Sequence, residues 1–320
     1  MNYNLLRDYM KQSMVVFIAT GLILTSCLSS NKAAVIVPDD KLAEIQARDT
    51  LIIATDADYV PQSKLLPDVL PNPETKCESS QYTANQFTGF DADVAVEIAR
   101  RLGVEACFVT PPWSQLVAGN WGDNWDAHVG SVAITSDRMK VLYFSQPYYA
   151  TPTVILIHKE NSNFNIPEDL SGKRIGVCAG CTFEEYLQGT LQIPGEKIDY
   201  RIQNPQIIAY ENEDPAIEAL SLGDGVKLDA VITILPIALA AIDAGRPVRM
   251  LDGPLLFAYA SVTLDRSSGR DSTRLLNEIS KIIQEMHRDG MLKKLSIEYQ
   301  GLDLTQEASR FDLNSIKQAP

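Results

Sequence analysis

The chain has 320 residues, of which 45% are hydrophobic, so it is long enough for two domain-sized cores and its composition excludes a largely disordered protein. Its formal net charge is -13, with no cluster of lysine or arginine. Phosphate binding needs a basic surface, so this charge argues against a nucleic-acid partner.

The first 27 residues have the pattern of a bacterial export signal. Arg7 and Lys11 precede an apolar run over residues 14–24, which has the length of a signal-peptide core and is short for a membrane span. The run ends in "LTSC", which resembles a lipobox in which Cys27 would carry a diacylglyceryl group and become the mature N-terminus. The alternative is an uncleaved anchor with an incidental cysteine. Both interpretations place the body outside the cytoplasm, tethered to a membrane.

Residues 28–48 lack sustained periodicity and are expected to form a linker between the lipid and the folded body. Helix and strand signals then alternate. The first series predicts a buried strand in "TLIIATDA" (50–57), an amphipathic helix in "FDADVAVEIARRLG" (90–103) and a strand in "VEACFVTP" (104–111). Residues 137–160 are interpreted as a loop followed by a crossing into a new strand.

A second series follows the crossing. Its expected elements are the strand "KRIGV" (173–177), the helix "CTFEEYLQG" (181–189), the strand "DYRIQ" (199–203), the helix "DPAIEALSLGDG" (214–225), the strand "DAVIT" (229–233) and the helix "LPIALAAIDAG" (235–245). A second crossing near residues 258–262 leads to a helical region over residues 271–301. Two such series joined by two crossings predict two α/β lobes, with mainly parallel sheets and a cleft between them.

Four cysteines remain after Cys27, an even number in an exported chain where disulfides persist. The economical pairing is local, Cys178 with Cys181 and Cys77 with Cys107, and the alternative is that some or all stay reduced.

The stretch "CAGC" lies where a strand turns into a helix, so it could be a redox dithiol, half of a metal site, or an anion-binding turn with paired cysteines. A metal is disfavoured, because none of the three histidines, His128, His158 and His287, has zinc-ligand spacing to these cysteines.

Two long stretches resemble the family 3 solute-binding proteins of bacterial ABC importers. They are "GFDADVAVEIARRLGV" and "WSQLVAGNWGDNWDAHVGSVAITSDRMKVLYFSQPYY", and the likeness extends over residues 50–304. It implies a two-lobed periplasmic-binding-protein-like II (Venus flytrap) fold, in which each lobe is a mixed, mainly parallel sheet flanked by helices. We expect residues 49–152 and 257–310 to form lobe 1 and residues 153–256 to form lobe 2.

The resemblance also implies the ligand-binding residues. Arg138 matches the arginine whose planar guanidinium pairs with the ligand α-carboxylate, and Tyr59 and Trp113 match aromatic residues over the ligand's aliphatic part. Core packing is the alternative for Trp113. Gly180 and Thr182 match the contact positions of the second-lobe turn, whose backbone N–H groups face the carboxylate. This match favours the anion-binding turn and leaves the redox dithiol as its alternative.

The sequence departs from the family around the ligand's ammonium group. Ile234 stands where a carboxylate usually pairs with that group, Ala133 replaces a common threonine and Ser131 a common glycine. Asp56 remains as an ammonium partner, and Thr233 or Ser131 could form single hydrogen bonds. With Asp56 as the only assigned acid, the expected ligand is neutral or anionic: a neutral or small amino acid, an N-substituted derivative, or another small carboxylate.

The resemblance implies a monomeric, lipid-anchored receptor outside the cytoplasm that binds an amino acid or related carboxylate, needs no cofactor and presents its closed form to an ABC permease. Two alternatives stay open. One is a dehydratase-like enzyme acting on a small cyclic acid, with Asp56 as its acid, and the other is a sensor for a separate signalling partner.

Overall fold

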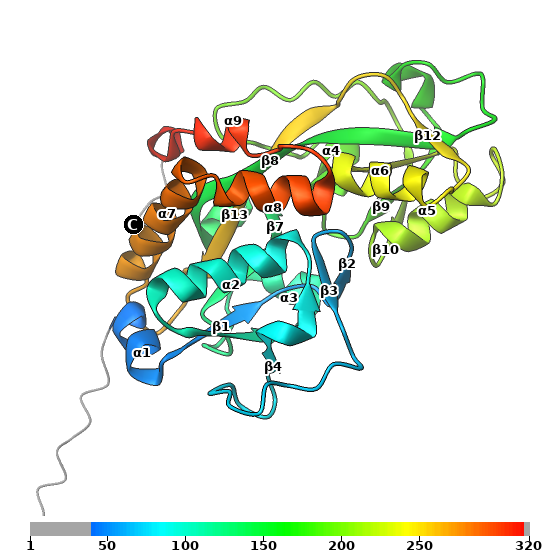
Figure 1. Cartoon of the computed structure of the whole chain (residues 1–320). Coiled ribbons are helices and arrows are strands. Elements are labelled where there is room, and N and C mark those ends of the chain that lie inside the picture. Colours follow the sequence, from blue (N-terminus) through cyan, green and yellow to red (C-terminus); the bar gives the residue numbers. More distant parts are fainter. Residues whose placement is uncertain (1–39, 317–320) are drawn as a thin grey trace, which may run out of the picture. The chain divides into compact units, whose positions relative to one another are not determined.

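The computed structural model describes residues 40–316, so the expected signal peptide, Cys27 and most of the expected linker lie outside the described residues (Figure 1). The helices are α1 (Lys41–Arg48), α2 (Phe90–Leu102), α3 (Trp113–Ala118), α4 (Thr182–Gln188), α5 (Glu213–Ser221), α6 (Leu235–Asp243), α7 (Thr273–Arg288), α8 (Met291–Gln300) and α9 (Gln306–Ser309). None of the helices within this described part has both the length and the apolar character that a membrane span requires.

The strands belong to one large and one small sheet. They are β1 (Thr50–Ala54), β2 (Asp58–Tyr59), β3 (Ser63–Leu65), β4 (Tyr82–Thr83), β5 (Phe87–Thr88), β6 (Glu105–Val109), β7 (Ala127–Ala133), β8 (Leu142–His158), β9 (Arg174–Cys178), β10 (Gln206–Tyr210), β11 (Ala230–Ile234), β12 (Val248–Met250) and β13 (Leu256–Asp265). The large sheet has the order β10-β9-β11-β8-β13-β7-β1-β6-β4, with β12 paired to β8, and β2, β3 and β5 form the small sheet.

Separate cores on the two halves of the large sheet confirm the two-lobed α/β fold. In one half, β1 pairs in parallel with β6 and β7, and its core includes Phe90, Ile98, Ile279 and Ile283 from α2 and α7. In the other half, β9 pairs in parallel with β10 and β11, and the buried core residues all fall between Val154 and Leu251. The α2 helix follows from its amphipathic pattern, and Gly103 ends it in a left-handed conformation (φ 77°) that favours glycine.

The two halves are joined by β8 and β13, which run side by side in the middle of the sheet (Figure 1). Their antiparallel pairing extends from Leu142 opposite Asp265 to Thr153 opposite Leu256, with irregularities near Ala260 and Ser261. Beyond that point β8 pairs with β11 and β12 in the second half. The sequence indicated a loop and a crossing over residues 137–160, whereas most of this segment is one continuous strand.

Two further expectations about local structure are wrong. Residues 41–48, expected as the end of the linker, form α1, because Asp40 caps the helix and Leu42 and Ile45 are buried in the first core. Residues 199–203, expected as a strand, lie in a connection, and the strand β10 begins just after Pro205. Proline lacks the N–H that a strand interior needs, which places the strand after it.

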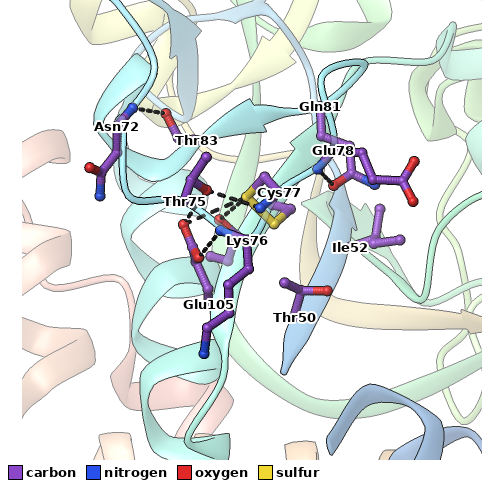
Figure 2. The surroundings of a disulfide bond; sticks show 12 residues. Thr50, Ile52, Asn72, Thr75, Lys76, Cys77, Glu78, Gln81, Thr83 and Glu105 are labelled. Atoms are coloured by element: carbon purple, nitrogen blue, oxygen red, sulfur yellow. Dashed lines mark hydrogen bonds between the residues drawn. A yellow bond between two sulfur atoms is a disulfide. The ribbon is translucent and has the colours of Figure 1, made fainter. Parts of the chain in front are cut away.

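The expected disulfide between Cys77 and Cys107 is present and joins the segment before α2 to β6 (Figure 2). Its Cα atoms are 5.4 Å apart. Glu105, two residues before Cys107, accepts hydrogen bonds from the Thr75 hydroxyl and from the Lys76 backbone N–H, the latter at 2.7 Å. The disulfide and these bonds hold the irregular segment before α2 against the edge of the sheet.

Candidate functional site

A pocket lies at the carboxyl ends of several strands of the large sheet, where α/β proteins commonly bind ligands. Asp56 follows β1, Cys178 ends β9, Glu213 follows β10 and Ile234 ends β11. We call this space the cleft pocket, and its lining consists of Asp56, Asp58, Tyr59, Trp113, Gly130, Ser131, Ala133, Arg138, Tyr149, Thr151, Cys178, Cys181, Thr182, Phe183, Glu211, Asn212, Glu213, Ile234, Ala258 and Ala260. Both halves of the sheet therefore contribute to one site.

Most of the residues expected to bind the ligand meet in this pocket. Those that line it are Asp56, Tyr59, Trp113, Ser131, Ala133, Arg138 and Thr182. Gly180 lies next to it without forming the lining. Thr233 is fully buried and is not part of the lining, because side chains alternate along β11 and the following residue, Ile234, faces the pocket instead.

Arg138 is a buried cation with free donor capacity. Its side chain is 6% exposed, and it donates from Nη1 to the Ala133 carbonyl oxygen at 3.2 Å and from Nη2 to the Gly180 carbonyl oxygen at 3.1 Å. Burial lowers the pKa of Arg138, and the charge of Glu185 opposes that shift. A guanidinium has five N–H donors, so the remaining ones can donate hydrogen bonds to an anion in the pocket.

Trp113 lies at the pocket and also packs against neighbouring protein groups. Its ring lines the pocket and also packs on buried groups, with the Arg138 Cζ atom 5.3 Å from the ring centroid and the His128 ring 6.1 Å away. The indole N–H donates to the Gly180 carbonyl oxygen at 3.4 Å. The contact with Arg138 has cation–π geometry, which helps to hold the guanidinium in place.

The turn "CAGCT" differs in detail from the expected anion-binding turn. Gly180 adopts φ +69°, a left-handed conformation that favours glycine, at the start of α4. Its backbone N–H donates to the Glu184 carboxylate at 2.7 Å, so this donor does not face the pocket freely. Thr182, the first residue of α4, is buried in the lining.

The cysteines of this turn form the expected disulfide. Cys178 and Cys181 are bonded, with Cα atoms 5.5 Å apart, and both line the pocket. Among the described residues, Cys178, Cys181 and Glu213 form a group of possible metal ligands within 4.8 Å of one another. Metal binding by cysteine requires thiolates, and the disulfide leaves none at this position.

A hydrogen-bonded network supports the first-lobe wall of the pocket. Ser131, with φ +58°, donates from Oγ to Asp91 Oδ2 at 2.6 Å and accepts from the Tyr149 hydroxyl at 2.7 Å. The Tyr148 hydroxyl donates to Asp91 Oδ1 at 2.8 Å. Burial raises the pKa of Asp91 to about 7, although both hydrogen bonds oppose the shift. Ser131 is therefore already engaged by protein groups.

Glu213 is the main residue that the sequence analysis missed. It is the first residue of α5, is 4% exposed and places Oε1 3.4 Å from Cys178 Sγ. Burial, reinforced by the charge of Asp56, raises the pKa of Glu213 to about 7, and burial with the charge of Asp58 raises that of Asp56 to about 6. Misplacing β10 hid this residue, because Glu213 is recognisable as a pocket residue only when α5 is seen to begin just beyond the carboxyl end of that strand.

These carboxyl groups correct the expectation that Asp56 is the only acid in the cleft. Asp58, Glu211 and Glu213 also line the pocket, whereas Arg138 is the one arginine or lysine of its lining. Glu213 supplies a second-lobe carboxylate in spite of Ile234. The premise that Asp56 is the only acid of the cleft is therefore wrong, and the lining offers one guanidinium and several carboxyl groups to a ligand.

Comparisons with known proteins agree with this geometry. Residues 75–302 match the model of the bacterial extracellular solute-binding proteins, family 3. The chain is 25% identical over 266 residues to the L-cystine-binding protein TcyJ of Escherichia coli K12, covering 83% of this chain and 88% of TcyJ. It is 25% identical over 259 residues to the lysine/arginine/ornithine-binding periplasmic protein of the same organism, covering 78% and 87%.

Solved structures show the same architecture. The ancestral amino acid-binding protein AncCDT-1, a precursor of cyclohexadienyl dehydratase, matches with a TM-score of 0.64 and 26% identity, over 81% of this chain and 99% of that one. The P235GK mutant of ArgBP from T. maritima matches in fold with a TM-score of 0.64 and 24% identity, over 82% and 100%.

Proposed function

Because the chain belongs to family 3 of the bacterial extracellular solute-binding proteins, we propose that it binds an amino acid in the cleft pocket and delivers it to the permease of an ABC importer. The observation that supports the ligand class is the buried guanidinium of Arg138 and the buried carboxyl group of Glu213 in one pocket, with the half-buried Asp56 beside them. In this proposal Arg138 pairs with the ligand α-carboxylate, and Asp56 and Glu213 accept from its ammonium group.

The aromatic side chains complete the proposed site. Tyr59 and Trp113 cover the aliphatic part of the ligand, and the disulfide-bonded turn with Thr182 closes the second-lobe wall. Relatives named for binding cystine and the basic amino acids support an amino acid as the ligand. The acidic lining extends the proposed range to amino acids with a net charge of zero or above.

We also propose that the protein acts outside the cytoplasm as a monomer anchored through Cys27, with no cofactor. The support for the anchor is the sequence pattern around Cys27. Mass spectrometry of the N-terminal peptide from detergent-extracted protein should show a chain that begins at Cys27 and carries a diacylglyceryl group, and Cys27→Ser should abolish that modification. An unmodified Cys27 in a chain that keeps residues 1–26 would contradict the lipid anchor.

The dehydratase alternative required a buried acid beside the ligand, and Glu213 meets that requirement, while Asp56 is half-buried. The relatives named above are binding proteins, however, and the chain is a binding protein of the same family. Binding is therefore the function that we propose.

A thermal-shift screen of the purified protein tests the ligand class. The panel contains the common L-amino acids, L-ornithine, L-cystine, N-acetylated amino acids and small organic acids. We expect stabilisation by one or more compounds that carry both an α-ammonium and an α-carboxylate group, because ligand binding to the folded state alone raises its stability. Stabilisation only by acids that lack the ammonium group would refute the proposed orientation.

A further inference from the structure

A second space lies directly beside the cleft pocket. Asp58, Tyr59, Asn212 and Glu213 line both spaces, so the two spaces share a wall. We call the second space the α6 groove, and its remaining lining consists of Val60, Asp214, Ile217, Ile237, Ala240, Ala241, Ala244 and Arg246. The free volume is about 290 Å³ in the groove and about 70 Å³ in the cleft pocket. There is thus more room beside the pocket than within it.

The walls of the α6 groove are apolar in the middle and charged at two positions, with Asp58 and Glu213 on the side shared with the cleft pocket and an ion pair away from it. Ala240, Ala241 and Ala244 come from α6 and its C-terminal end, and their small side chains leave the space open. Ile217 and Ile237 add buried apolar surface. The second charged position holds Arg246 and Asp214, which form an ion pair at 3.4 Å with both side chains partly or largely exposed.

This arrangement suits one kind of molecule. A short amino acid held by Arg138, Asp56 and Glu213 would fill the small pocket and leave the groove unused. A longer side chain would pass Tyr59 and Glu213, bury apolar atoms against the alanines of α6, and bring a polar end near Arg246 and Asp214. The exposed ion pair offers both a donor and an acceptor to such an end.

We propose that the α6 groove is a second ligand subsite, for α-amino acids whose side chain is a long, mainly apolar arm with a charged or polar end. This inference rests on the proposed function, because the amino-acid head of the ligand occupies the cleft pocket. The groove then selects for length and the cleft pocket for the head group.

Calorimetry with a matched pair of probes tests the subsite. S-methyl-L-cysteine and L-cystathionine share the amino-acid head and the thioether, and only L-cystathionine carries a long arm with a second charged end. The wild-type protein is expected to bind L-cystathionine at least about ten-fold more tightly, as burial of two or more methylene groups would produce.

Variants on one helix locate the effect. Ala241→Phe fills the groove. It should lower the affinity for L-cystathionine about ten-fold or more and change the affinity for S-methyl-L-cysteine less than about two-fold. Asp243→Phe introduces the same phenylalanine side chain at an exposed position of α6 outside the groove lining. It should leave the affinity for both probes unchanged. Ala244→Phe, at a more exposed groove position, repeats the test should Ala241→Phe fail to fold.

Two results with the Ala241→Phe variant would overturn the subsite. One is an equal loss of affinity for both probes, and the other is an unchanged affinity for L-cystathionine. Wild-type protein that binds S-methyl-L-cysteine and not L-cystathionine also overturns the subsite and leaves the proposed function standing. Binding of neither probe overturns it too, and the amino-acid screen then decides the proposed function separately.

Discussion

Replacing Glu213 with glutamine should weaken ligand binding and stabilise the ligand-free protein at the same time. The side chain is 4% exposed and lines the cleft pocket, so its carboxylate would form a buried, charge-assisted hydrogen bond to a ligand ammonium group. Hydrogen bonds to charged groups contribute about 1.5–3 kcal/mol. Glu213→Gln should therefore lower the affinity by roughly ten-fold to more than a hundred-fold.

The gain in stability follows from the pKa of Glu213. Burial raises it from 4.5 to about 7 in the folded protein, so between these pH values the folded state binds more protons than the unfolded state. The free energy of unfolding consequently falls as the pH rises through this range. At about 1.4 kcal/mol per pH unit, the ionised carboxylate of Glu213 costs up to about 3 kcal/mol above pH 7.

Glutamine cannot ionise, so the variant should be more stable than the wild type at about pH 8 and equally stable near pH 4.5. Denaturant unfolding at both pH values, with calorimetry of the ligand found in the screen, measures both effects. Adding Ile234→Asp to Glu213→Gln should recover part of the affinity, because Ile234 also lines the pocket. Undiminished affinity would remove Glu213 from the binding site, and a loss of stability at pH 8 would refute the reasoning from burial.

The other predictions concern the guanidinium, the pH and the first disulfide. Arg138→Lys keeps the charge and loses the planar donor pair, so calorimetry should show about ten-fold weaker binding or more; unchanged affinity would exclude Arg138 from the site. Raising the pH from about 5 to about 8 should strengthen amino-acid binding, because Asp56 and Glu213, with pKa values of about 6 and 7, must ionise to pair with the ammonium group. Titration in buffers of different ionisation enthalpy should show proton release on binding below pH 7, and proton uptake would contradict this assignment. Cys77→Ala with Cys107→Ala should lower the free energy of unfolding by about 3 kcal/mol and leave affinity unchanged, since neither residue lines the pocket; altered affinity would show that the disulfide shapes the site.

Local sequence patterns predicted the elements of this fold whose signals are strong. The strand before Asp56, the helix ended by Gly103 and the strand–turn–helix around Cys178 all have clear periodicity or capping residues. The edge strand β10 was missed because its burial is partial, and that error concealed Glu213. No local signal shows that an acid at a helix start points inward, because its burial depends on contacts with Tyr59 and Cys178, which are distant in sequence.

The number of acids in the cleft pocket was underestimated for a related reason. Ile234, taken alone, stands where the family pattern has a carboxylate, and so it suggested that the second lobe supplies none. The pocket is lined by residues from several elements, so a carboxylate at the start of α5 can face the same space as a side chain at the end of β11. The α6 groove was also beyond sequence analysis, because it depends on how α6 lies beside Tyr59.

The paired strands β8 and β13 constrain how the two halves of the protein can move. A ribbon of two hydrogen-bonded strands resists bending more than two independent chain segments, because each strand must follow the curvature of the other. Opening should therefore occur as a single rotation about one axis, with small changes spread over several peptide units around Thr153 and Leu256. Its amplitude would respond to substitutions that alter the twist of this ribbon, at positions distant from every atom of the bound molecule.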